Sequence, residues 1–182
     1  MIILASKSPR RRELLSLITT DFIVKSADAD ETLSENPSPR EAVERLSLIK
    51  AKPFENENKT VIGADTVVSA DSQILGKPEN DDEAFKMLRF LSGREHCVYT
   101  GVTILNGKKT KTFSCCTKVN FFDLTDDEIL AYIASGECSD KAGAYGIQGR
   151  GSLLVKEIHG DYFNVVGLPV SILARELRNF KL

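Results

Sequence analysis

The sequence predicts a mixed α/β fold, in which a single sheet of parallel and antiparallel strands is flanked by helices. Two observations predict it. In the first half of the chain, apolar runs typical of strands alternate with amphipathic helical patterns. In the middle, two long strand patterns flank Asn106-Gly107, a dipeptide typical of a tight β-hairpin turn. This order favours a mixed sheet over a uniform series of βαβ units. The long hairpin would form a second lobe, with a cleft between the two lobes.

The first expected element is a strand followed directly by a helix. The apolar run 1–5 predicts a buried strand, and Ser8 and Pro9 have the residue types of an N-cap and a first helical position. Residues 10–12, all arginine, then fall in the first helical turn, where the helix dipole favours acidic side chains. Positive side chains, free backbone N–H groups and the dipole would point at one place, which suits a phosphate. The alternative is three solvated arginines on an ordinary helix.

The next elements are predicted from the spacing of apolar residues and from the residues that break helices and strands. Residues 22–25 predict a short strand, and 40–51 predict a helix with one apolar face and Lys50 in its last turn. Residues 60–69 are rich in valine and isoleucine and predict a central strand. Residues 73–79 predict a turn around Gly76.

The second half is expected to continue with a helix at 81–91, hairpin strands at 95–105 and 110–124, a helix at 125–135, a strand at 152–158 and a last helix at 168–180. Thr125 and Glu128 have the spacing of a capping box at the start of their helix.

Length and composition describe an ordinary globular protein. The chain has 182 residues, a length sufficient for one domain (1–182) with two lobes. Of these residues 42% are hydrophobic and 27% are charged, as is usual for a globular protein. A net charge of -2 and a pI near 5.8 argue against a stable nucleic-acid partner. The four cysteines lack metal-ligand spacing, and no apolar stretch has the roughly 20 residues of a membrane span. We therefore expect a cytoplasmic protein with reduced thiols and no membrane association.

Four charged residues are candidates for chemistry. Asp65 lies inside an otherwise apolar strand pattern, where a carboxylate is costly unless it is paired, bound to a metal or placed at a cleft. Lys77 lies between Gly76 and Pro78 in a rigid turn, which suits contact with a phosphate. The alternative is an ordinary exposed turn lysine. Lys50 is either a helix-end charge or a phosphate ligand, and Glu31 is by itself a loop charge.

The stretch 140–151 is unusually rich in glycine. Such density predicts backbone with positive φ or close approach to a ligand, although a flexible loop is the alternative. Neither the dinucleotide-binding fingerprint nor the P-loop spacing is present. Tyr145 and Gln148 are the side chains there that could contact a base, by stacking and by hydrogen bonds.

These candidates together suggest a nucleotide site. Basic groups bind a polyphosphate, while carboxylates hold a divalent cation and orient or deprotonate a water molecule. Neither histidine has a credible partner in the sequence, so a Ser-His-Asp or Cys-His arrangement is not expected.

Several short motifs resemble those of the Maf family of nucleoside triphosphate pyrophosphatases, a family first associated with septum formation. The matching segments are Leu4-Ala5-Ser6, Ser8-Pro9-Arg10-Arg11, Glu13-Leu14-Leu15, Gly63-Ala64-Asp65-Thr66-Val67, Gly76-Lys77-Pro78, Leu91-Ser92-Gly93 with His96, Asp140 to Gly149, and Val166-Gly167-Leu168-Pro169. The resemblance covers essentially the whole chain.

The resemblance implies an inosine-triphosphatase-like fold with an elongated mixed sheet and two lobes around a central cleft. It implies hydrolysis of dTTP and UTP to the monophosphate and pyrophosphate, with Mg²⁺, Mn²⁺ or Co²⁺ as the divalent cation. By position, Asp65 resembles the family's proton acceptor. The phosphate-handling set is Ser6, Arg10, Arg11, Lys50 and Lys77, the metal set is Glu31 and Asp65, and the substrate-selecting set is Arg10, Thr66 and Gln148.

Two other functions stay open at this point. The chain could be a nucleotide-binding regulator of cell division with little catalysis, or a pyrophosphatase of the branch that acts on 7-methyl-GTP. Modified pyrimidine nucleotides are further expected substrates. The family often forms homodimers, and Asp28 or Asp30 could take the role given to Glu31.

Overall fold

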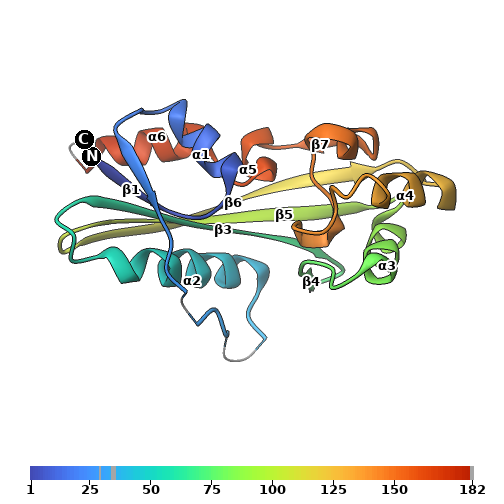
Figure 1. Cartoon of the computed structure of the whole chain (residues 1–182), viewed down its shortest axis with the longest axis horizontal. Coiled ribbons are helices and arrows are strands. Elements are labelled where there is room, and N and C mark those ends of the chain that lie inside the picture. Colours follow the sequence, from blue (N-terminus) through green and yellow to red (C-terminus); the bar gives the residue numbers. More distant parts are fainter. Residues whose placement is uncertain (29, 34–35, 181–182) are drawn as a thin grey trace. The chain divides into compact units, whose positions relative to one another are not determined.

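The computed structural model of the chain describes residues 1–28, 30–33 and 36–180 (Figure 1). The strands are β1 (Ile2–Ala5), β2 (Phe22–Lys25), β3 (Thr60–Ala70), β4 (Gln73–Leu75), β5 (Glu95–Asn106), β6 (Lys109–Phe121) and β7 (Val155–His159). The α-helices are α1 (Pro9–Ser16), α2 (Pro39–Ala51), α3 (Asp81–Leu91), α4 (Asp126–Ile133), α5 (Tyr162–Val166) and α6 (Val170–Arg178). Short 3₁₀ turns span Lys52–Phe54, Ala142–Ala144 and Gly149–Leu153.

The strands form one mixed sheet of seven strands. They hydrogen-bond in the order β2-β1-β3-β5-β6-β7, and β4 pairs with β3. β1 runs parallel to both β2 and β3, whereas β4 is antiparallel to β3 and β7 is antiparallel to β6. The mixed sheet with flanking helices predicted from the sequence is therefore confirmed. Within the described residues, no helix has the length and apolar character needed to cross a membrane.

The chain divides into two compact units. The first comprises Met1–Thr66, Thr100–Cys115 and the chain from Gly167 onward, and the second comprises Val67–Tyr99 and Cys116–Val166. Three strands, β3, β5 and β6, contribute one part to each unit. The cleft predicted between two lobes stays a prediction.

In the first unit, α2 packs very closely against the sheet. A Cβ atom on Gly63 of β3 would lie 2.2 Å from the carbonyl oxygen of Ser47, and one on Gly101 of β5 would lie 2.3 Å from that of Val43. The Ser47 hydroxyl also bonds the buried Thr103 hydroxyl of β5 at 2.8 Å. Figure 1 shows α2 on one face of this part of the sheet and α1 and α6 on the other. The two glycines therefore let the helix backbone contact the strands directly.

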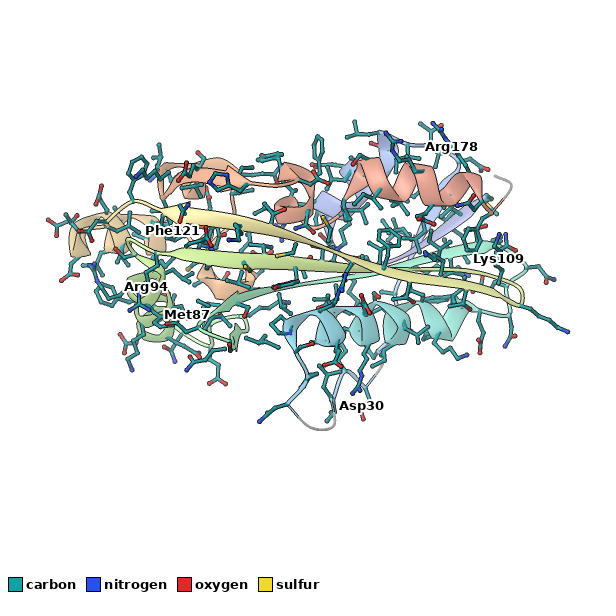
Figure 2. The ribbon with its side chains drawn as sticks, turned by 180° about the vertical axis from the view of Figure 1, so that it is seen from behind. Asp30, Met87, Arg94, Lys109, Phe121 and Arg178 are labelled. Atoms are coloured by element: carbon teal, nitrogen blue, oxygen red, sulfur yellow. The ribbon has the colours of Figure 1, made fainter. Side chains whose placement is uncertain are left out.

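The second unit has its own core, which α3, α4 and the strands share. Phe121 of β6, labelled in Figure 2, packs edge-on against the rings of His96 and Tyr145, with centroids 5.0 and 4.7 Å away. The Nε2 atom of His96 lies 2.7 Å from the Tyr145 hydroxyl. Burial lowers the pKa of His96 to about 4, so this histidine is a neutral core residue at pH 7.

Most predicted boundaries hold within a few residues, and β4 is the main exception. The turn expected at 73–79 begins instead with β4, which folds back on Val68–Ala70 through Asp71 and Ser72. Both turn residues have positive φ, 47° and 64°, as a tight hairpin requires. Asp-Ser is a poor sequence marker for such a turn, because neither residue is glycine. α5 also has no counterpart among the predicted elements.

Candidate active site

The candidate site lies where β1 ends and β3 continues. Ala5, the last residue of β1, pairs with Gly63, so β3 extends past its parallel neighbour. Asp65 and Thr66 lie on this extension, and the loop from Ser6 to α1 starts beside it. Ligands of α/β sheets commonly bind outside the carboxyl ends of parallel strands.

The turn after β1 is organised by two serine hydroxyls. The buried Ser6 Oγ accepts a hydrogen bond from the Ser8 N–H at 3.2 Å. Ser8 is the N-cap of α1, as predicted, and its Oγ accepts from the Arg11 N–H at 3.4 Å. With Pro9 in the first turn, the helix begins shortly after the strand and places Arg11 next to Thr66 of β3.

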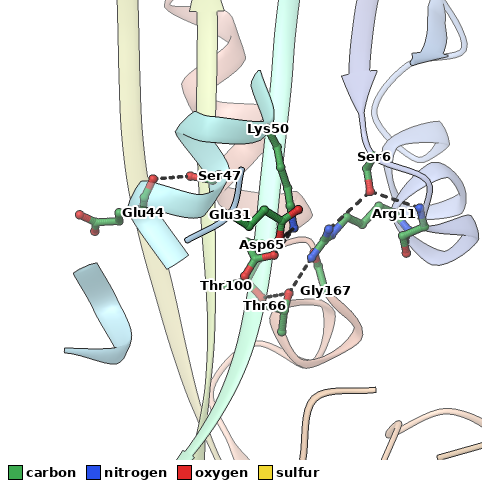
Figure 3. Close-up of polar contacts among 11 residues, drawn as sticks. Ser6, Arg11, Glu31, Glu44, Ser47, Lys50, Asp65, Thr66, Thr100 and Gly167 are labelled. Carbon is green, nitrogen blue, oxygen red and sulfur yellow. Dashed lines mark hydrogen bonds and ion pairs between the residues drawn. The ribbon is translucent and has the colours of Figure 1, made fainter. Parts of the chain in front are cut away.

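The Arg11 side chain is anchored by three oxygen atoms (Figure 3). Its Nε donates to the Gly167 carbonyl at 2.9 Å, and its two terminal nitrogens donate to Thr66 Oγ1 at 3.0 Å and to Ser6 Oγ at 3.4 Å. Burial lowers the pKa of Arg11 from its usual value, the Asp65 carboxylate opposes this shift, and the charge of Arg10 adds to it. These bonds fix the plane of a guanidinium that can still reach an oxyanion through its remaining N–H groups.

Lys50 lies between two carboxylates. Its ammonium group hydrogen-bonds Asp65 Oδ1 and lies 3.4 Å from Glu31 Oε2. Asp65 is only 8% exposed, whereas the Glu31 side chain is half exposed. The pairing explains how a carboxylate is accommodated within a buried strand. The predicted proximity of Glu31, Lys50 and Asp65 is thus found in the structure.

Asp65 and Thr66 divide the site over the two faces of β3. Successive side chains of a strand point to opposite faces. Asp65 accordingly meets Lys50 of α2, and Thr66 meets Arg11 of α1, as Figure 3 shows. Thr66 also bonds the Thr100 hydroxyl of β5 at 2.9 Å. The Asp65–Lys50 pair and the Thr66–Arg11 pair therefore lie next to each other, at two consecutive residues of β3.

The other two arginines of α1 differ from Arg11. Arg10 is half-buried and close enough to Arg11 for its charge to lower the pKa of Arg11. Arg12 is exposed and lies outside the matching family motif.

Lys77 and Gln148 belong to the second unit, and both side chains are exposed. Gln148 lies in a closed loop, in which a Cβ on Gly151 would lie 1.9 Å from the Gly146 carbonyl oxygen. The Glu137 carboxylate accepts from the Arg150 N–H at 3.0 Å and helps to hold this loop. The positive φ predicted for the glycine-rich stretch is confirmed at Gly143 and Gly149, with values of 67° and 61°.

Tyr145 does not have the role suggested from the sequence. Its side chain is buried, its hydroxyl bonds His96, and its ring packs on Phe121. Burial also raises the pKa of Tyr145. The ring is therefore a core element and cannot stack on a base, and His96 has the partner that sequence reasoning missed.

Among the described residues, Glu31 and Asp65 are the predicted metal ligands, and both pair with Lys50 in the structure. Among residues 1–28, 30–33 and 36–180, no group of three His, Cys, Asp or Glu side chains could hold a metal ion. Mg²⁺ typically takes only one or two protein carboxylates and obtains its other ligands from water and substrate phosphates. The two oxygen donors Glu31 and Asp65 fit that pattern.

Comparisons with known proteins identify the family. The family model described as "Maf-like protein" matches residues 1–180. The chain belongs to the Maf family. A Bacillus mycoides (strain KBAB4) protein named dTTP/UTP pyrophosphatase is 52% identical over 98% of this chain and 95% of its own length. A protein of the same name from Bacillus cereus (strain AH187) is 52% identical over 100% of this chain and 96% of its own.

Two solved structures share the fold of this Maf chain. The Staphylococcus aureus Ham1 protein has a TM-score of 0.56 and 16% identity, and a HAM1 protein from Coxiella burnetii has 0.51 and 15%, each covering 98% of both chains. At such low identity the likeness concerns the fold alone, and it confirms the inosine-triphosphatase-like fold expected for the family.

Sequence reasoning missed two of the groups that organise this Maf site. The Gly167 carbonyl lies in a segment that matches the family motif. Every residue has a backbone carbonyl, however, so the residue type does not show which carbonyl forms a contact. Gly167 has a φ of 127°, which favours glycine, and its carbonyl accepts the hydrogen bond from Arg11 Nε. Thr100 lies in no motif, and only the pairing of β5 with β3 brings it to Thr66.

Proposed function

We propose that this Maf protein hydrolyses dTTP and UTP, and also modified pyrimidine nucleotides, to the monophosphate and pyrophosphate. The observation that carries the proposal is the meeting of two groups at Asp65-Thr66. Lys50 and Glu31 approach the aspartate, and Arg11 approaches the threonine. One group suits activation of water beside a cation, and the other suits a polyphosphate. The names of the Bacillus relatives point to the same activity.

The triphosphate is held by the start of α1. Arg10 and Arg11 supply positive charge, and Ser6 supplies a hydroxyl at the same turn. The free N–H groups and the dipole at the helix N-terminus add to the attraction. Because Arg11 is already anchored, little reorganisation is needed when charge develops on the departing pyrophosphate. Lys50 and Lys77 complete the proposed phosphate-binding set.

Asp65 is the proposed proton acceptor. Its carboxylate takes a proton from the water molecule that attacks the α-phosphorus, and the bond from this phosphorus to the bridging oxygen breaks. Lys50 holds the carboxylate in place from α2. Thr66, on the opposite face of the strand, holds Arg11 toward the phosphates. The nucleoside monophosphate and pyrophosphate are the two products.

Glu31 and Asp65 would hold the divalent cation, with Mg²⁺, Mn²⁺ and Co²⁺ as candidates. When bound, such an ion neutralises phosphate charge and lowers the pKa of a coordinated water molecule. Base selection is assigned to Arg10, Thr66 and Gln148, the positions at which the chain resembles the dTTP and UTP branch of the family.

A panel of triphosphates tests this proposal. Pyrophosphate release is measured with dTTP, UTP, CTP, dATP, GTP and 7-methyl-GTP, each with Mg²⁺, Mn²⁺ or Co²⁺. We expect the highest kcat/KM for dTTP and UTP. Preference for 7-methyl-GTP would assign the chain to the other branch, and no release from any substrate would favour a nucleotide-binding regulator.

Two neighbouring arginines give a matched control. Arg11→Ala removes the anchored guanidinium, so we expect kcat/KM to fall by about 100-fold, as is typical for the loss of one preorganised charge-stabilising donor. Arg12→Ala removes the same charge from an exposed position outside the motif and should leave turnover unchanged. Equal losses in both variants would mean that only the net charge of α1 matters.

A further inference from the structure

We infer that Thr100 is a positioning residue of this site: its hydroxyl fixes Thr66 and, through Thr66, the guanidinium of Arg11. The inference rests on the proposed pyrophosphatase function and adds a residue that lies in none of the family motifs.

Thr100 lies on β5, which hydrogen-bonds β3 in the sheet. It is completely buried, and its Oγ1 lies 2.9 Å from Oγ1 of Thr66. Valine has almost the same shape and is favoured on buried strands. A buried hydroxyl costs free energy unless it is hydrogen-bonded, so packing alone does not call for threonine at this position.

The hydrogen-bond pattern shows what the hydroxyl does. Thr66 Oγ1 accepts a hydrogen bond from Arg11 and carries a single proton. In one arrangement Thr66 donates that proton to Thr100. In the other, Thr100 donates to Thr66, whose own proton is then directed to a ligand. In both arrangements Thr66 Oγ1 is held from two sides, which selects one χ1 rotamer of this side chain.

Loss of the Thr100 hydroxyl would affect Arg11 indirectly, through Thr66. Thr66 would be free to choose another rotamer, and the bond from Arg11 to Thr66 would be lost in part of the population. Arg11 would keep its bonds to Gly167 and Ser6, so the substrate would still bind. The guanidinium would be less well oriented for the charge that develops on pyrophosphate, so kcat should fall more than KM rises.

The test compares three variants. Thr100→Val removes the hydroxyl and keeps the shape; we expect kcat for dTTP to fall about three- to tenfold, the worth of one neutral hydrogen bond, with KM within about twofold. Thr100→Ser keeps the hydroxyl and should retain a wild-type kcat. Thr117→Val is the matched control: Thr117 is equally buried and hydrogen-bonded, but to Asp161 and Asn164 in the second unit.

A double-mutant cycle decides whether Thr100 acts through Thr66. In a Thr66→Val background, Thr100→Val should cause no further loss of kcat. Additive losses would overturn the inference, as would an unchanged kcat in Thr100→Val or an equal loss in Thr100→Ser. If the wild-type chain releases pyrophosphate and these variants do not behave as stated, the positioning role alone fails. If the wild-type chain releases none, the proposed function fails first.

Discussion

Replacement of Gly63 by alanine tests how the close packing of α2 against β3 affects the site. The new Cβ atom would lie 2.2 Å from the Ser47 carbonyl oxygen and 2.9 Å from both the backbone nitrogen and Cβ of Ala51. Real Cβ atoms essentially never approach another heavy atom within 3.0 Å. All three contacts are with the helix backbone or its first side-chain atom, so no rotamer change can relieve them. α2 must therefore move away from β3 by about 1 Å.

Two consequences of this movement can be estimated. Overpacking of a well-packed interface costs about 1–3 kcal/mol of unfolding free energy. Lys50 follows Ser47 by one helical turn, so its ammonium group is displaced from Asp65 together with the helix. A displacement of about 1 Å at a catalytic group lowers turnover by up to about 100-fold. We expect a kcat about 10- to 100-fold below wild type, together with a lower urea midpoint.

Urea unfolding followed by circular dichroism and pyrophosphate release from dTTP measure the two effects. Gly76→Ala is the control for stability, because a Cβ at Gly76 meets no atom within 4 Å. It should unfold at or slightly above the wild-type midpoint, since alanine restricts the unfolded chain. A Gly63→Ala variant with wild-type midpoint and turnover would show that α2 does not rest on β3 at this glycine.

Three further predictions follow from other parts of the molecule. His96 has a pKa of about 4 in the folded protein and an ordinary pKa of 6.5, so the unfolded chain binds a proton first as the pH falls. The unfolding free energy should therefore decrease below about pH 6.5, by about 2 kcal/mol between pH 7 and pH 5. The urea midpoint of His96→Gln should depend less on pH than that of the wild type. Thr125→Ala removes an N-cap whose Oγ1 accepts from the Glu128 N–H at 3.3 Å, and should lower the unfolding free energy by about 1 kcal/mol in urea titrations without changing kcat. Chelation of the divalent cation with EDTA should abolish pyrophosphate release. The melting temperature of the nucleotide-free protein should not change, because Lys50 already pairs with the carboxylates of Glu31 and Asp65. A large drop in melting temperature would instead indicate a structural metal.

Local features of the fold were predictable from the sequence. Ser8 and Pro9 at the start of α1, and Thr125 with Glu128 at the start of α4, have the predicted capping roles. The hairpin predicted at Asn106-Gly107 joins β5 and β6, but Asn106 ends β5 and the turn consists of Gly107 and Lys108. These features depend on neighbours within a few residues, so residue type and spacing are sufficient to find them.

The acidic half of the site was also predictable, for a different reason. Asp65 stands out because a carboxylate interrupts an apolar strand, and Lys50 because it ends an amphipathic helix. Each anomaly is visible alone, and burial of the aspartate then requires a partner. Glu31 had only the family resemblance to distinguish it from its acidic neighbours.

The remaining features depend on long-range pairing, which residue type does not reveal. Thr100 reaches Thr66 only because β5 lies beside β3. Tyr145 looked available for a base because it lies in a glycine-rich stretch, but its ring is buried in the core against His96. β4 forms because Asp71 and Ser72 adopt positive φ, a conformation that their residue types do not favour strongly.

The central claim is that Asp65 accepts the proton during hydrolysis of a pyrimidine triphosphate. Asp65→Asn tests it most directly, because the amide keeps the shape of the carboxylate but is a poor base. With dTTP and a saturating divalent cation, pyrophosphate release should fall by at least about 100-fold, while the circular dichroism spectrum stays that of the wild type. Wild-type turnover in the Asp65→Asn variant would contradict the claim.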